Sequence, residues 1–280
     1  MIHASILEDR AVLALSGAET RDFLQGLITN DMSAGADGRA IYAALLTPQG
    51  KVLFDFLVIP NGEDRLLIDC AAARAADLAK RLSIYRLRAK VDIAPRPELA
   101  VAALWGDSVA ADIPHGIGAF ADPRHPGLGL RAIAPRDVLA RALSDIATGD
   151  YQAHRLALGV PDSADLPPDS VFALDAGLEE LNGVSFKKGC YIGQEVTARM
   201  KHRATARRRF VLVEYAGELL AAGTSLESEG RELGTLASGM NGKALALVRL
   251  DRLAEAEAKH APILAGGVAV RLKKPGWFHG

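Results

Sequence analysis

The chain has 280 residues, of which 33 are Lys or Arg, 34 are Asp or Glu and two are Cys, and 49% are hydrophobic. This length predicts roughly two domains, with three small ones possible. Two cysteines exclude a disulfide scaffold and cannot supply the four thiolates of an ordinary iron–sulfur cluster. There is no signal-peptide core and no apolar run near the ~20 residues of a membrane span, so we expect a cytoplasmic protein with no membrane contact.

The first 95 residues predict strands joined by tight turns, with helices between them. The strongest signal is Pro48-Gln49-Gly50-Lys51, which separates two apolar runs and is typical of a hairpin turn. In chain order we expect a hairpin over 5–16, a helix over 19–28, a hairpin over 41–59, a strand over 65–69 and an Ala-rich helix over 71–82.

The middle of the chain has weaker patterns. Residues 105–127 are rich in Gly and Pro and are expected to be mainly loop. Residues 163–172 are interrupted by Pro167 and Pro168 and are expected to form an extended linker. The other expected elements are strands over 91–94, 99–104 and 128–133 and helices over 137–146 and 151–158.

The last part of the chain is dominated by short strand candidates. Five of them follow one another at 210–215, 224–228, 232–238, 244–250 and 267–273. This spacing predicts a small closed β-barrel or sandwich in a separate C-terminal domain. Strands joined by hairpins, with helices inserted between groups of strands, indicate an α+β fold rather than a doubly wound parallel sheet.

The charge of the chain is unevenly distributed. Residues 187–209 contain eight Lys or Arg and one acid, Glu195, so their net charge of +7 leaves −8 on the rest of the chain. Such a segment attracts anions. Nucleic-acid binding is one interpretation, but the segment has a single Tyr and the chain is 5% aromatic, which leaves few rings for stacking bases. We therefore expect no nucleic-acid partner.

Within the basic segment, Cys190 lies between Gly189 and Gly193 and shortly after Lys187 and Lys188. A helix is expected to begin two residues after the cysteine. A helix N-terminus and neighbouring ammonium groups both favour a thiolate, so the thiol is predicted to be reactive or metal-binding. The alternative is that Cys190 is a small buried side chain within a solvated charged surface.

A family resemblance becomes visible at this cysteine. The string KGCYIGQE, residues 188–195, resembles the signature of the YgfZ family of folate-binding proteins that assist iron–sulfur proteins. Four further blocks occur in the expected order and extend the resemblance over nearly the whole chain: residues 23–31, 43–56, 85–93 and 151–161. The family is related to the folate-binding T-protein of glycine cleavage, an aminomethyltransferase.

The resemblance implies a GcvT/YgfZ-like three-domain ring with tetrahydrofolate in its central hole. Two interleaved α+β domains would cover residues 1–95, with the folate-binding role, and residues 96–204, ending in the cysteine segment. A C-terminal antiparallel β-barrel would cover residues 205–280. The five strand candidates agree independently with this barrel.

The resemblance also implies a function. The protein would bind tetrahydrofolate or a derivative and assist assembly, maintenance or repair of iron–sulfur proteins, including those that support tRNA modification. Its partners would be folate and iron–sulfur client or assembly proteins. Cys190 would act as the functional thiol and as a candidate ligand of a transient shared cluster, with no intrinsic metal site. Whether it ligates a transferred cluster, reacts with an oxidised partner or senses redox state is left open.

Two groups of residues are carried over from this resemblance. The residues that match the signature around Cys190 are Lys187, Lys188, Gly189, Tyr191, Gly193, Gln194 and Glu195. The candidate folate contacts are Gln25, Thr29, Asn30, Asp55, Arg199 and Arg203. For residues 25–30 a helix end and turn is an equally good interpretation. The thiol is expected to open onto the folate-binding hole.

Two departures from the T-protein bear on catalysis. Phe54-Asp55 stands where the transferase has adjacent aspartates, and Ala157 stands where it has a carboxylate that grips the pterin. A carboxylate accepts two hydrogen bonds from the adjacent N–H groups of a pterin, so its loss weakens the case for transfer chemistry. An active folate-dependent aminomethyl or one-carbon transferase is kept as the alternative.

Overall fold

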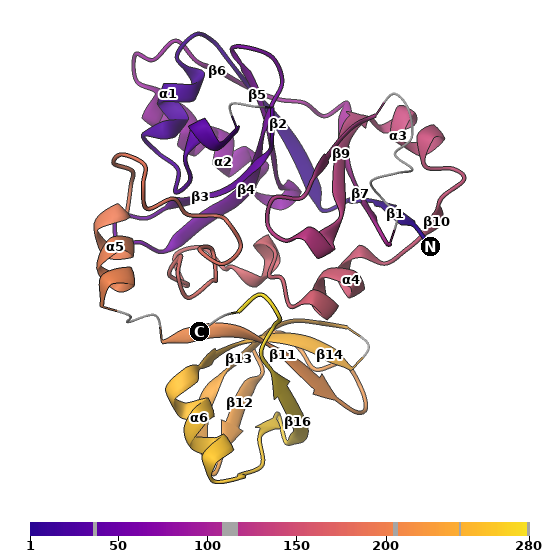
Figure 1. Ribbon diagram of the computed structural model, residues 1–280, viewed down its shortest axis with the longest axis vertical. Helices are drawn as coiled ribbons and strands as arrows, with labels where there is room; N and C mark the ends of the chain where they lie inside the picture. The colour runs from indigo at the N-terminus through magenta and orange to yellow at the C-terminus, as the bar shows by residue number, and fades with distance from the viewer. Residues whose placement is uncertain (36–37, 108–116, 204–206, 241, 279–280) are drawn as a thin grey trace.

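The computed structural model describes residues 1–35, 38–107, 117–203, 207–240 and 242–278. It contains two five-stranded sheets and a closed barrel, and the barrel lies beneath the sheets in Figure 1. The expected α+β architecture with a C-terminal barrel is confirmed. None of the described helices is long and apolar enough to cross a membrane.

The first sheet is antiparallel and has the order β3-β4-β5-β2-β6. Its strands are β2 (Arg10–Ser16), β3 (Ile41–Leu46), β4 (Val52–Pro60), β5 (Arg65–Ala71) and β6 (Asp92–Pro95). Helices α1 (Thr20–Gln25) and α2 (Ala75–Arg86) flank the sheet, with the 3-10 turns η1 (Met32–Gly35) and η2 (Ala72–Arg74). Leu24, Leu78 and Leu82 of the two helices are buried in one hydrophobic cluster with Phe56 of β4. The hairpin expected over 41–59 is confirmed.

The second sheet has the order β10-β1-β7-β9-β8. Its strands are β1 (His3–Ile6), β7 (Leu99–Trp105), β8 (Gly118–Ala121), β9 (Leu130–Pro135) and β10 (Ala147–Thr148), and α3 (Arg136–Ala142) follows β9. All pairs are antiparallel except β1 with β10.

The hairpin expected over 5–16 is wrong. β1 pairs with β7 in the second sheet, whereas β2 pairs with β5 and β6 in the first. Between them the chain crosses from one sheet to the other, where the Leu7 N–H donates to the Val101 carbonyl at 2.8 Å. Arg10 then places its guanidinium in the buried space between the sheets, 2.6 Å from Asp69. This crossing places β1 in the second sheet, whereas the expected first domain covered residues 1–95.

The C-terminal barrel closes in the order β11-β14-β13-β12-β15-β16. Its elements are β11 (Arg208–Tyr215), β12 (Ser225–Ser228), β13 (Arg231–Met240), β14 (Lys243–Arg249), α6 (Leu250–Ala258), β15 (Leu264–Ala265) and β16 (Val268–Lys273). Five of the six strands correspond to the predicted ones. The sequence pattern missed α6, which buries Leu253 and Ala256 against the barrel, and the two-residue strand β15. The predicted boundary at residue 204 lies outside the described residues.

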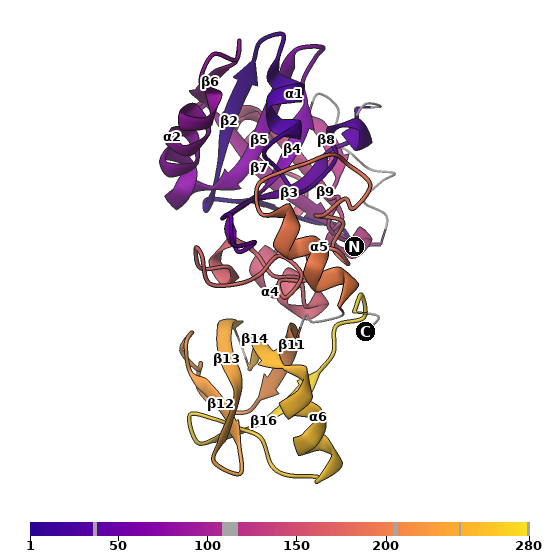
Figure 2. The ribbon, with the colours of Figure 1, turned by 90° about the vertical axis from the view of Figure 1, so that its left-hand side faces the viewer.

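Short helices and irregular segments connect these bodies. They are η3 (Pro126–Leu128), α4 (Tyr151–Leu158), η4 (Ser163–Asp165) and α5 (Gln194–His202), and Figure 2 shows α4 and α5 between the sheets and the barrel. The prediction of an extended linker over 163–172 is wrong. This segment begins with the 3-10 turn η4, which Asp162 and Asp165 stabilise through a capping box. It ends in a bridge between Lys51 and Phe172 at the β3–β4 turn.

Candidate functional site

Cys190 is an exposed, free thiol in the loop that precedes α5. The helix begins at Gln194, two residues later than expected, after Gly193 at φ 81°. A Cβ at Gly193 would lie 2.6 Å from the Thr47 carbonyl oxygen, so only glycine fits here. This close approach packs the start of α5 against the β3–β4 turn and fixes the base of the cysteine loop.

Lys188 anchors the same loop from the other side. Its Nζ donates hydrogen bonds to the backbone carbonyls of Gln25 at 2.6 Å, Ile28 at 2.6 Å and Asn30 at 2.9 Å, and it lies 5.1 Å from the Tyr191 ring centroid. Burial lowers the pKa of this ammonium to about 8, and Asp31 acts in the opposite direction. The charge of Lys188 is thus directed at carbonyls of the last residue of α1 and of the turn after it, and these bonds join the 23–31 block to the cysteine loop.

The remaining signature residues lie along the loop and the first turns of α5. Lys187 and Gly189 are exposed, Tyr191 is buried and Gln194 is half-buried. Glu195 and Arg199 share one helix face, as expected, and form an exposed ion pair at 2.5 Å.

The C-terminal end of α5 carries exposed cations next to this loop. Arg203 is exposed at the end of the helix, and Lys201 Nζ lies 5.7 Å from the centroid of Phe186, a ring that is 38% exposed. Cys190 is therefore part of a solvent-facing surface with basic side chains.

A separate cavity of about 590 Å³ lies between β3, β8 and the segment around residue 182. Its described lining residues are Asn30, Ala34, Gly38, Arg39, Ala40, Ile41, Tyr42, Phe120, Ala121, Pro123 and Asn182. Phe120 is half-buried and Asn182 is exposed, so this ring and this side-chain amide are available to a ligand, whereas Tyr42 is only 1% exposed. Cys190 is not among these residues, so the cavity and the thiol are distinct places.

The structure places the candidate folate contacts in different environments. Asn30 lines the cavity and its Nδ2 donates to the carbonyls of Tyr42 at 2.8 Å and Asn182 at 2.7 Å. Thr29 is fully buried and donates to the Gly183 carbonyl at 2.6 Å. Gln25 faces a different surface groove and bonds Asp31. The cavity lining does not include Thr29 or Gln25, and both hold the 25–31 turn in place.

Asp55 lies behind the cavity rather than in it. Its carboxyl group is buried and accepts a hydrogen bond from the Tyr42 hydroxyl at 3.1 Å, so it acts on the lining through that ring. Burial raises the pKa of this carboxyl group, and the nearby carboxylate of Asp162 raises it further. Arg199 and Arg203 lie on α5 and do not line the cavity.

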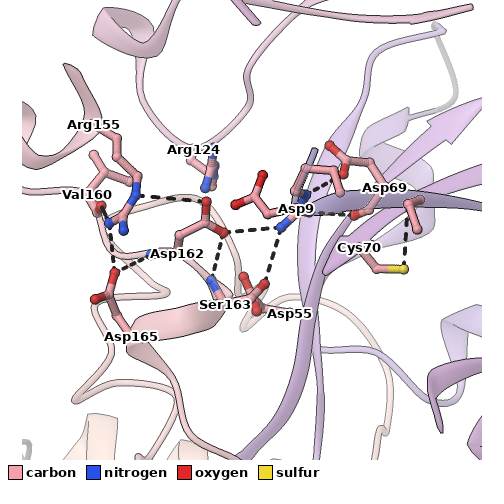
Figure 3. Close-up of polar contacts among 12 residues, drawn as sticks. Asp9, Asp55, Asp69, Cys70, Arg124, Arg155, Val160, Asp162, Ser163 and Asp165 are labelled. Carbon is pink, nitrogen blue, oxygen red and sulfur yellow. Dashed lines mark hydrogen bonds and ion pairs between the residues drawn. The ribbon is translucent and has the colours of Figure 1, made fainter. Parts of the chain in front are cut away.

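A network of buried ion pairs lies next to Asp55 in the interior (Figure 3). Arg10 bridges Asp69 at 2.6 Å and Asp162 at 3.2 Å. Arg155 reaches Asp165 at 2.7 Å, and its Nη2 donates to Ser238 of the barrel at 3.1 Å. The network therefore joins the first sheet, the segment after α4 and the barrel.

The second half of this network lies on the second sheet. Asp122 accepts from Arg124 at 2.7 Å and from Arg131 at 3.1 Å, and Arg131 also reaches Asp69 at 3.3 Å. Both guanidiniums donate to the Tyr151 hydroxyl, at 3.0 and 3.1 Å. The sequence did not predict this network. The available signal was a charged residue inside an apolar run, as Arg131 and Asp69 are.

Comparisons with known proteins give the family. Residues 9–112 match the GCVT N-terminal domain, and residues 207–280 match the C-terminal beta-barrel domain of CAF17. The chain is 35% identical to the human mitochondrial iron–sulfur cluster assembly factor IBA57, over 88% of this chain and 77% of the human protein. It is 33% identical to the mouse protein of the same name, with the same coverage. The chain belongs to the IBA57 family.

The fold is shared with a solved structure. The glycine cleavage system aminomethyltransferase T from Bartonella henselae superposes with a TM-score of 0.78, at 17% identity, over 99% of this chain and 86% of the other. At this identity the likeness concerns the fold alone. The cysteine signature predicted membership of the YgfZ family. The comparisons give the IBA57 family instead, so membership of YgfZ itself stays a prediction.

The expected cytoplasmic location is wrong. The IBA57 relatives from human and Neurospora crassa are named mitochondrial, and this points to the mitochondrion rather than the cytoplasm. The expectation rested on the lack of a secretory signal core. That feature bears on secretion alone, since mitochondrial targeting uses amphipathic, Arg-rich segments of a different kind.

Proposed function

We propose that this protein assists the assembly, maintenance or repair of iron–sulfur proteins and that Cys190 is its functional thiol. The observation that carries the proposal is an exposed thiol on a loop fixed at both ends, by Lys188 and by Gly193, in a member of the IBA57 family. A fixed loop presents the sulfur to a partner with little loss of conformational entropy on binding.

Cys190 can supply only one thiolate ligand to a metal ion or cluster. Among the described residues there is no group of three or more His, Cys, Asp or Glu side chains placed to hold a metal ion. A cluster is therefore treated as cargo, to which Cys190 contributes one thiolate while a client or assembly protein contributes the others. Such shared ligation suits transient transfer rather than permanent storage.

We also propose that tetrahydrofolate, or a derivative, binds in the cavity between Tyr42 and Phe120. Its volume of about 590 Å³ falls within the range of small-molecule sites, ~300–1,000 Å³. The ring of Phe120 suits a flat pterin, and the exposed side-chain amide of Asn182 suits its polar edge. The described lining has no carboxylate, so the group that would grip the adjacent N–H donors of the pterin is replaced by weaker amide acceptors.

This lining does not favour the alternative, an active aminomethyl or one-carbon transferase. Transfer requires a folate held in one orientation, and Asp55 is engaged with Tyr42 behind the cavity wall. Turnover of an aminomethylated carrier protein or a methylamine donor by the purified protein would support the transferase over the binding role.

The thiol is tested by its replacement. Cys190→Ser should abolish the ability of the purified protein to speed recovery of an apo iron–sulfur enzyme in an anaerobic reconstitution. Cys70→Ala removes the other thiol, which is buried, and serves as the matched control that retains activity. Equal activity of Cys190→Ser and the wild type would exclude a role of the sulfur.

Folate binding is tested independently. Titration with tetrahydrofolate should show saturable binding that Phe120→Ala weakens by roughly tenfold or more, because a stacked ring is lost. Phe186→Ala removes an exposed ring outside the cavity and should leave the affinity unchanged. Absence of saturable binding by the wild type would overturn this part of the proposal and leave the thiol role untouched.

A further inference from the structure

A second small cavity lies where α5, the barrel and the segment around residue 172 meet. Its volume is about 310 Å³, near the lower end of small-molecule sites. Its lining residues are Phe172, Asp175, Val196, Met200, Arg207, Arg208 and Arg249. Three guanidinium groups against one carboxylate give this cavity a net positive charge, and neither Cys190 nor the folate candidates belong to it.

Two of these arginines face each other across neighbouring strands, a placement of like charges that does not stabilise the fold. Arg208 and Arg249 are direct partners in the antiparallel ladder of β11 and β14, and like charges placed opposite each other destabilise a sheet. Asp251 compensates Arg249 through two hydrogen bonds, at 3.1 and 2.6 Å. No ion pair joins the side chains of Arg207 or Arg208 to any residue that the structure describes.

The acidic groups next to the cavity are already occupied. Asp175 is buried, accepts the backbone N–H of Arg208 at 3.3 Å and lies 3.9 Å from Nη1 of Arg209. Glu180 accepts from Arg209 at 3.3 Å. Burial raises the pKa of the Asp175 carboxyl group, opposed by its backbone hydrogen bonds. The charge of Arg208 also acts on Asp175, together with that of Arg209, so this single carboxylate is shared and the side chains of Arg207 and Arg208 keep a net positive charge toward a ligand.

The other side of the cavity is apolar. Val196 and Met200 are one turn apart on α5 and contribute side chains to the lining, and Phe172 is held at the bridge with Lys51. Gly50 packs against Val196 from the β3–β4 turn, where a Cβ would lie 3.0 Å from the valine Cβ. An inorganic ion would use the arginines and leave this apolar side unfilled.

We propose that this cavity binds a small organic anion whose carboxylate groups face Arg207 and Arg208 and whose hydrocarbon part packs on Met200, Val196 and Phe172. Guanidinium forks bind carboxylates through two parallel hydrogen bonds, which sets the orientation of the ligand. The inference goes beyond the proposed function and does not depend on it, because the cavity contains no residue of the cysteine loop or of the folate cavity.

The test is calorimetric titration of the full chain at low salt with phthalate, an aromatic dicarboxylate, and with inorganic phosphate. We expect saturable binding of phthalate that is tighter than that of phosphate and weakens as salt is added. Arg208→Gln should weaken phthalate binding by about tenfold or more, and Arg208→Lys should weaken it less, since the charge is kept and the fork is lost. Arg271→Gln removes an exposed charge from β16 of the same barrel and should have no effect.

A second variant protects the test against misfolding of the arginine variants. Met200→Gln should weaken phthalate binding and leave phosphate binding unchanged. The proposal is overturned if phthalate does not saturate, if Arg208→Gln binds it as well as the wild type, or if phosphate binds as tightly as phthalate. Binding of a poly-glutamate peptide without binding of phthalate would also overturn it, in favour of an acidic partner protein.

Discussion

The interior and the α5 surface use the same chemical groups for opposite purposes. Between the two sheets, the guanidinium of Arg131 is 1% exposed and contacts the carboxylates of Asp69 and Asp122. On α5, Arg199 and Glu195 also form an ion pair, but their side chains are 56% and 84% exposed. A buried charge that loses its partner is left without water, whereas an exposed one is solvated at once. The interior pairs therefore hold the fold together, and the surface charges are available for recognition.

The largest effect is expected in the interior, from Asp122→Ala. This change leaves Arg124 and Arg131 buried without their shared carboxylate, and should destabilise the protein by about 3–5 kcal/mol. Urea unfolding monitored by circular dichroism measures the loss. Glu8→Gln removes a carboxylate from an exposed pair with Arg136 and is the matched control, for which no resolvable change is expected. Equal effects of the two variants would remove the distinction between interior and surface.

The second largest effect is expected from acid, which should lower the free energy of unfolding through the buried carboxyl groups. Burial works against ionisation of Asp122 and Asp162, but neighbouring arginines, Arg124 for the first and Arg10 for the second, outweigh it and hold the pKa of both carboxyl groups well below the ordinary value. Groups with a depressed folded pKa give stability that is fully present above their unfolded pKa of about 3.9, and lose it as the pH falls below that value. Asp55 opposes this loss, since its pKa is raised.

The measurement is the free energy of unfolding at several pH values between 6 and 3. A decline should appear below about pH 4 in the wild type and be smaller in Asp122→Asn, which has one depressed carboxyl group fewer. A decline of unchanged size in that variant would mean that exposed carboxylates, not the network, control acid stability.

The third prediction concerns the anchor of the cysteine loop. Lys188→Met leaves the carbonyls of Gln25, Ile28 and Asn30 without their shared donor and should cost about 1–3 kcal/mol. The loop should also loosen, so the rate at which Cys190 reacts with a disulfide reagent should change. Lys187 is exposed and one residue away, so Lys187→Met is the matched control. It should alter the free energy of unfolding and the reaction rate of Cys190 only by the effect of removing one surface charge. A folded Lys188→Met with an unaltered thiol rate would show that the anchor does not position the sulfur.

The sequence predicted those parts of the molecule that local patterns determine. The β3–β4 hairpin followed from its turn residues, and the barrel followed from regularly spaced short strands. The false hairpin over 5–16 shows the limit, because the choice between two neighbouring sheets depends on distant partners: β5 lies 49 to 61 residues from β2, and β7 lies 96 to 102 residues from β1.

The candidate site divides in the same way. Local signals placed Cys190 in a glycine-flanked loop before a helix and predicted the Glu195–Arg199 pair, which depends on helix geometry, while the role of the thiol stays a prediction. They did not show that Lys188 faces three carbonyls of a distant turn, or that Asp55 lies behind Tyr42. Those contacts join positions far apart in the chain, and single-sequence periodicity carries no information about them.

The smallest effect is expected on the surface of α5, from Glu195→Gln. The change removes an exposed i,i+4 ion pair with Arg199 and an acid from the first turn of the helix, and should cost less than about 1 kcal/mol in total. The midpoint of urea unfolding should shift slightly, with an unchanged slope. A cost as large as that of Lys188→Met would mean that this exposed pair fixes the cysteine loop, and the contrast between a structural interior and a recognition surface would then fail on the helix that follows the thiol.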